Sequence, residues 1–176
     1  MSTALPEPWL RGLVPGIPAL LQPVAHAFVM AREDVELSVR GLSAAQIWTT
    51  PQGVASLGFH LAHLAGSTDR LLTYARGLSL DEAQKAVLGR ERTLAVDQPS
   101  IDTLLATWQA TVERALAQLA ATPESSLTDP RTVGRAKLSS TVLGLLFHAA
   151  EHASRHTGQV VTTARFVRAI AEAQTP

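Results

Sequence analysis

The apolar residues of this chain recur at the spacing of an α-helix in four long segments. They follow the i, i+3, i+4, i+7 pattern that lines one face of a helix, whereas strand-like alternation of β-branched residues is scarce. The segments cover residues 24–42, 54–76, 100–122 and 140–168. We therefore predict an all-α fold, a four-helix bundle with long connecting loops at residues 43–53, 77–99 and 122–138.

Residues that start and stop helices mark the ends of these segments. Gly41 and Gly77 suit the C-terminal ends of the first and second helices, and Ser100 suits the N-cap of the third. Ser79 with Glu82 three residues later forms a possible capping box, which predicts a short helix after the second long one.

Composition limits the partners and the chemistry. With 176 residues and 46% hydrophobic content, we expect a single domain over residues 1–176. Lys and Arg together number 15, as do Asp and Glu, so there is no electrostatic reason to expect a nucleic acid or an anionic membrane as partner. There is no cysteine, so any metal must be held by His, Asp or Glu. We see no signal peptide and no membrane span, and we expect a cytoplasmic protein.

Three of the six histidines lie at four-residue intervals in "HAAEHASRH", residues 148–156. At about 100° per residue, five polar side chains share one stripe of the fourth helix. These are His148, His152, Arg155, His156 and Gln159. Leu145 lies within the stripe, so we expect this face to turn inward. An unpartnered buried polar group costs roughly 1–3 kcal/mol, and a bound cation would remove that cost.

Two histidines one helical turn apart can bind the same ion, with each imidazole nitrogen about 2.0–2.1 Å from it. A third ligand should come from a facing helix, and the second helix offers His60 and His63 in "FHLAHLAG". His63 is the better candidate because Leu61 and Leu64 flank it in the core pattern. A lone core histidine usually bonds a backbone carbonyl, which is our expectation for His26 and the alternative for His60.

One short motif suggests a different enzyme. Residues 148–152 read H-A-A-E-H, which matches the H-x-x-E-H signature of inverzincin peptidases. In that interpretation Glu151 is the base, and His148 and His152 are ligands. Those peptidases have a further acidic ligand well downstream, whereas only Glu172 follows here, in the last few residues.

Several segments together resemble the DinB-like superfamily, which includes YfiT-like proteins and mycothiol-dependent maleylpyruvate isomerase. They are "EPWLRG", "GLSAAQIWTTP", "LGFHLAHLAGSTDRLLTYARG" and "EHASRHTGQV", in the family's order along the chain. The resemblance implies an up-down-down-up bundle and a divalent metal held by His63, His152 and His156. His148 lies outside this three-residue pattern, and whether it is an added ligand stays open.

The resemblance also implies a metal-dependent thiol S-transferase that acts on a low-molecular-weight thiol and an electrophilic substrate, and a homodimer. Zinc is the expected ion, with nickel, iron and manganese as alternatives. A metal-dependent hydrolase, a non-catalytic metal-binding stress-response protein and a bundle whose histidines bind nothing stay open. Around the metal, the residues expected to support a ligand or contact the substrate are His60, His148, Arg155 and Gln159. We expect Gln159 to orient a ligand by hydrogen bonding, and Arg155 to find a carboxylate or an anionic substrate.

Overall fold

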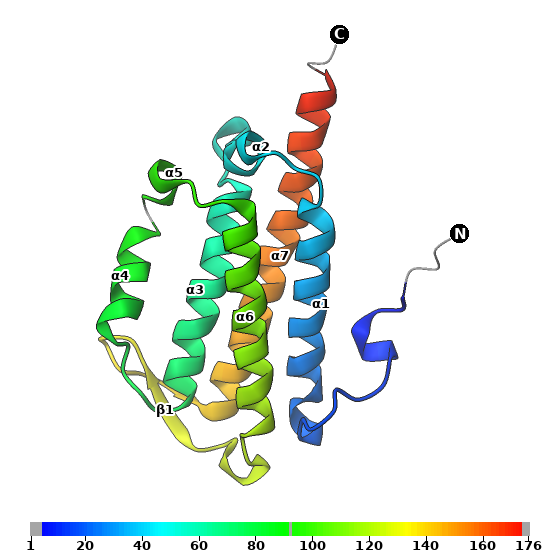
Figure 1. Cartoon of the computed structure of the whole chain (residues 1–176). Coiled ribbons are helices and arrows are strands. Elements are labelled where there is room, and N and C mark those ends of the chain that lie inside the picture. Colours follow the sequence, from blue (N-terminus) through cyan, green and yellow to red (C-terminus); the bar gives the residue numbers. More distant parts are fainter. Residues whose placement is uncertain (1–4, 92, 174–176) are drawn as a thin grey trace.

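The computed structural model describes residues 5–91 and 93–173, and four long helices form its centre (Figure 1). They are α1 (Gln22–Val39), α3 (Leu57–Ala75), α6 (Ile101–Ala120) and α7 (Val142–Ala173). In Figure 1, α1 and α7 run upward and α3 and α6 run downward. Both α6 and α7 pack against α1 and α3. The all-α, up-down-down-up bundle predicted from the sequence is confirmed.

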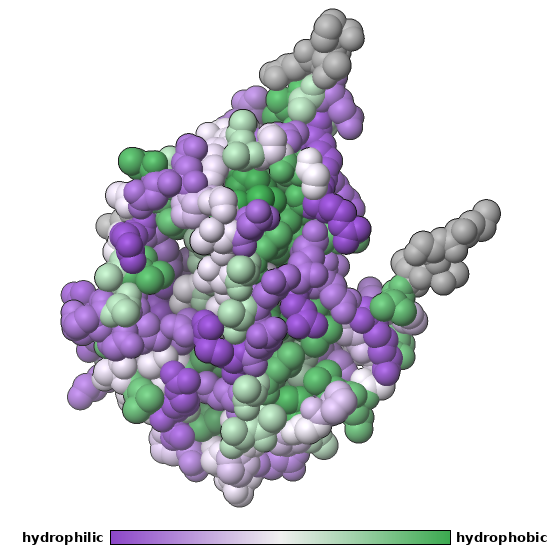
Figure 2. Space-filling model, in the orientation of Figure 1, coloured by the Kyte–Doolittle hydropathy of each residue, from purple (hydrophilic) through white to green (hydrophobic). Residues whose placement is uncertain are grey.

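Side chains from all four long helices fill the core. Trp108 of α6, Phe28 of α1, Leu61 of α3 and Leu146 of α7 are fully buried. Hydrophilic side chains cover much of the face in Figure 2, with one larger apolar area near its middle and separate apolar residues elsewhere. Among the described helices, none has the length and apolarity that crossing a membrane requires.

Short helices occupy the connections between the long ones. They are α2 (Ala44–Trp48), α4 (Glu82–Arg90), α5 (Leu94–Asp97) and the 3-10 helices Pro51–Gly53 and Glu124–Ser126. Two further 3-10 helices, Pro8–Leu10 and Ala19–Leu21, precede α1. The connection from α3 to α6 therefore contains two helices, α4 and α5, beside α3 (Figure 1).

The predicted capping box at Ser79 is wrong, because the N-cap of α4 is Asp81. The Asp81 carboxylate accepts the backbone N–H of Gln84 at 2.7 Å, and Gln84 Oε1 accepts the backbone N–H of Asp81 at 3.1 Å. The side-chain amide of Gln84 also donates to Asp69 of α3 at 2.6 Å. The Asp81–Gln84 box has an advantage over the predicted one, because Gln84 both closes the box and attaches α4 to α3.

A β-hairpin lies where the sequence predicted only a loop. Strand β1 (Pro130–Val133) pairs antiparallel with β2 (Leu138–Thr141), so that Pro130 faces Thr141 and Val133 faces Leu138. Arg131 donates from Nε to the Ala75 carbonyl at 2.8 Å, which attaches the hairpin to the end of α3. Strand β2 leads directly into α7, so the last helix begins at Val142 rather than Ser140.

Candidate metal centre

Three histidines meet where α3 packs against α7. His63 comes from α3, and His152 and His156 come from α7 one helical turn apart. One ring nitrogen from each lies within 4.8 Å of the others. The Nε2 atoms of His63 and His152 are 3.0 Å apart. The structure therefore brings together the three histidines that the sequence predicted to converge.

The distance between the His63 and His152 nitrogens suits two ligands of one divalent ion. At metal–nitrogen distances of about 2.0–2.1 Å, cis nitrogens around an octahedral or tetrahedral ion lie about 2.9–3.4 Å apart. The 3.0 Å between His63 and His152 falls in this range. Three histidines in this arrangement could hold such an ion.

Burial favours the neutral form of His152 and His156. Desolvation by burial, assisted by the neighbouring His63, lowers the pKa of His152 and lowers the pKa of His156 to about 4. Metal coordination needs an unprotonated ring nitrogen, so a low pKa prepares both side chains to bind an ion at neutral pH.

This low pKa predicts how the metal-free protein responds to acid. Between about pH 6.5 and 4 the unfolded chain protonates its histidines while the folded His156 stays neutral, so protons favour unfolding. Stability should therefore fall as the pH falls through this window. Urea unfolding at several pH values across this window should show a smaller decrease in the free energy of unfolding for His156→Gln than for the wild type. An equal loss in the two proteins would contradict this assignment.

Glu91 supports His63 from the segment that follows α4. Its Oε2 accepts from His63 Nδ1 at 2.9 Å, and its Oε1 accepts from Arg70 at 2.6 Å. Burial acts to raise the pKa of Glu91, but the hydrogen bonds from His63 and Arg70 outweigh it and lower that pKa. An ionised carboxylate only accepts, so Nδ1 of His63 carries a proton, and Nε2 is the nitrogen that faces His152. Carboxylate partners of this kind orient metal-binding histidines.

Gly66 leaves room for this carboxylate. A Cβ atom at position 66 would lie 2.8 Å from Glu91 Oε1 and 2.9 Å from the Arg70 guanidinium. Both distances are shorter than normal contacts, so the Glu91–Arg70 pair can lie this close to α3 only beside a glycine. Sequence reasoning missed Glu91, because no periodic pattern marks the segment that contains it.

His60 supports His156 in a similar way. It is buried on α3, and its Nδ1 lies 3.0 Å from Nδ1 of His156. Burial, then the neighbouring His63, lowers the pKa of His60, so both rings are neutral and one Nδ1 donates to the other. The alternative of a backbone carbonyl partner is wrong for His60. It is correct for His26, whose Nε2 bonds the Gly12 carbonyl at 2.9 Å.

Only one edge of the predicted polar stripe turns inward. His152 and His156 are partly buried, whereas His148, Arg155 and Gln159 are exposed, which corrects the expectation for the whole stripe. The reason is that α7 packs against both α1 and α3, so its buried sector is centred near Ala149 and Ala153.

Gln159 does not orient a ligand. Its side chain is exposed, and no hydrogen bond within residues 5–91 and 93–173 joins it to a histidine, so that expectation is wrong. We predict that Gln159→Ala leaves metal content unchanged and shifts the free energy of unfolding by less than about 0.5 kcal/mol. Metal analysis and urea unfolding check both values, and a clear loss of metal would contradict the prediction.

Arg155 binds a carboxylate one turn earlier on its own helix. Its Nε and Nη2 donate to the two Glu151 oxygens at 2.8 and 2.6 Å. Glu151 also lies 3.3 Å from His148 Nδ1. This arrangement does not support the peptidase interpretation, because Arg155 occupies the proposed base and His148 stands outside the histidine cluster.

Comparison with known protein families agrees with this geometry. The family model of the DinB superfamily matches residues 27–160, a range that contains all three clustered histidines. The chain belongs to the DinB superfamily. No curated protein matches this DinB superfamily member.

Proposed function

We propose that this DinB superfamily protein is a metal-dependent enzyme of the thiol S-transferase type. One observation carries the proposal: within the described residues the centre offers three imidazole nitrogen donors and no fourth side-chain ligand. Glu91, the carboxylate beside it, is already bonded to His63 and Arg70. Three protein ligands with an open position are typical of catalytic rather than structural metal sites.

Each side chain has a separate task in this proposal. His63, His152 and His156 would hold the ion, for which zinc is the expected choice. Glu91 fixes the tautomer of His63, and the Phe59 ring stacks on that imidazole at 5.6 Å between centroids. A divalent ion held there would lower the pKa of a thiol or water bound at the open position.

An external thiol suits this chain better than a protein thiol, because the sequence contains no cysteine. Enzymes related to mycothiol-dependent maleylpyruvate isomerase, which the sequence resembles, take such a thiol as a substrate. The electrophile would approach from the exposed side of the histidine cluster. There the Glu151–Arg155 pair and His148 supply polar groups on the same helix, within four residues of His152.

The test uses protein prepared without a histidine tag or nickel column. Metal-loaded protein is incubated with bacillithiol, mycothiol, glutathione or coenzyme A and a panel of electrophiles, and the loss of free thiol is followed. The matched controls are the triple variant His63→Ala, His152→Ala, His156→Ala and the single variant His26→Ala. We expect transfer by the wild type and His26→Ala only. Equal rates in the wild type and the triple variant would overturn the proposal, and metal-dependent ester hydrolysis without thiol transfer would replace it with a hydrolase.

A further inference from the structure

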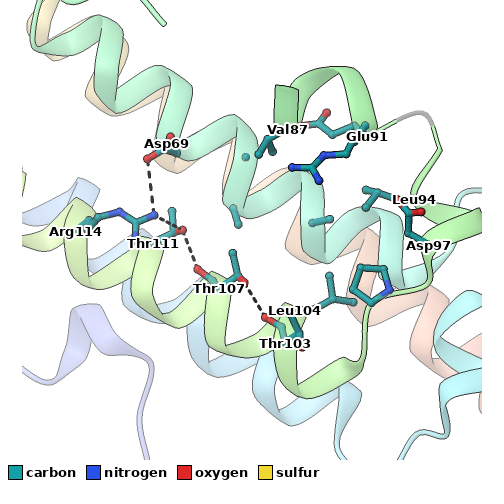
Figure 3. A pocket seen from close by; sticks show the side chains of 15 residues that line it. Asp69, Val87, Glu91, Leu94, Asp97, Thr103, Leu104, Thr107, Thr111 and Arg114 are labelled. Atoms are coloured by element: carbon teal, nitrogen blue, oxygen red, sulfur yellow. Dashed lines mark hydrogen bonds and ion pairs between the residues drawn. The ribbon is translucent and has the colours of Figure 1, made fainter. Parts of the chain in front are cut away.

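A second site lies on another side of α3, between α3 and α6 and beneath α4 and α5 (Figure 3). It is a cavity of about 670 Å³, within the range of about 300–1,000 Å³ usual for small-molecule sites. Its apolar walls come from all four of these helices. They include Ala62, Ala65, Val87, Leu94 and Leu104.

This cavity is distinct from the candidate metal centre. None of the three clustered histidines lines it. At about 100° per residue, the lining residues Ala62, Ala65 and Asp69 lie about 100–160° around α3 from His63. Glu91 is the shared element, because it lines the cavity and also bonds His63.

A ladder of threonines defines the polar wall. Thr103, Thr107 and Thr111 follow one another at successive turns of α6 and line the cavity (Figure 3). The Thr107 hydroxyl donates to the Thr103 carbonyl at 2.7 Å, and the Thr111 hydroxyl donates to the Thr107 carbonyl at 2.8 Å. Because these hydroxyl protons are used, the oxygens can only accept from a ligand. The Thr111 oxygen already accepts from Arg114 at 2.9 Å, and the Thr103 hydroxyl bonds Ser100 at 2.9 Å, so among these three threonines Thr107 is the one left to accept from a ligand.

The charges around the cavity balance. Asp69 lies 3.7 Å from Arg114, and Asp97 and Arg90 add one charge of each sign. The Glu91 carboxylate is paired with Arg70 at 2.6 Å. Since neither sign dominates, the cavity does not select an ion.

We propose that this cavity binds a neutral small molecule with an apolar body and an N–H or O–H donor directed at Thr107. A ligand that fills the cavity contacts the Glu91 carboxylate and thereby changes its hydrogen bond to His63. Ligand occupancy is therefore coupled to the orientation of a proposed metal-binding histidine, which makes the cavity a regulatory site. The coupling step rests on the proposed role of His63, whereas the binding step does not.

The binding test uses metal-free protein, so its result is independent of metal binding and activity. The probe is 4-phenylbutanamide, and its N,N-dimethyl derivative is the matched probe without a donor. In amide NMR titrations, 4-phenylbutanamide should give saturable shifts in residues 62–69 and 103–111. It should bind about fivefold more tightly than the dimethyl derivative, the effect of one hydrogen bond. Absence of saturable shifts up to about 10 mM, or shifts centred elsewhere, would overturn the site.

Variants separate the steps. Thr107→Val keeps the side-chain shape but removes the acceptor, so the two probes should bind it equally. Ala62→Phe should block binding because Ala62 lines the cavity, whereas Ala106→Phe, at an exposed position of α6, should not.

The coupling has its own test: the imidazole nitrogen resonances of His63 should move as 4-phenylbutanamide saturates the cavity. Saturation with unchanged His63 resonances would overturn the coupling, and retained fivefold discrimination in Thr107→Val would overturn the role of Thr107.

Discussion

Replacing any one of His63, His152 or His156 by alanine is expected to remove nearly all bound metal. Each change reduces three nitrogen donors to two, and the described residues offer no fourth donor in the cluster. The decrease in metal affinity should exceed the roughly 10–100-fold decrease that follows from mutating a residue that hydrogen-bonds to a metal ligand. Metal content per chain, measured after dialysis against a weak chelator, tests this expectation.

His148→Ala is the matched control for these variants. His148 belongs to the same four-residue series on α7, but its side chain is about half exposed (49%) and it stands outside the cluster. Its removal should leave metal content unchanged. Near-stoichiometric metal in the triple variant, or loss of metal in His148→Ala, would place the centre elsewhere.

Long periodic segments made the bundle predictable. Helix α6 illustrates this, because its apolar stripe, its N-cap Ser100 and its end before Pro123 are all local features of the sequence. The hairpin β1–β2 has strands of only four residues, too short for a period to be recognised. The N-cap of α4 is Asp81, two residues after the predicted Ser79, because Asp81 and Gln84 form an equally good local pattern.

Helical spacing predicts which residues of the candidate site share one face of a helix, but not which face is buried. Four-residue spacing on α7 places His152 beside His156, and the same rule applies wherever the helix packs. Which edge of the stripe faces inward depends on the neighbours α1 and α3, and this is why His148 and Gln159 were placed on the wrong side. Glu91 lies 28 residues from His63, and only the path of α4 brings their side chains together.

Glu91 is expected to contribute more to metal affinity than any other residue outside the three histidines. Glu91→Gln keeps the size of the side chain but replaces a buried anion that accepts from His63 and Arg70. Loss of such a carboxylate partner typically weakens metal binding by about 10–100-fold. Competition with a chelator of known affinity measures this change. Unchanged affinity would mean that His63 needs no carboxylate to bind the ion.

A pair of glycine variants tests the same contact without touching a charged group. In Gly66→Ala the new methyl group would lie 2.8 Å from Glu91 Oε1 and 2.9 Å from the Arg70 guanidinium, so these side-chain ends must shift, and we expect the Glu91–His63 hydrogen bond to weaken. In Gly89→Ala, on α4 two residues before Glu91, the methyl group meets nothing within 4 Å. We therefore expect Gly66→Ala to lower metal affinity in the direction of Glu91→Gln, and Gly89→Ala to match the wild type. Equal affinities in the two glycine variants would show that the close approach of Glu91 to α3 does not control the metal centre.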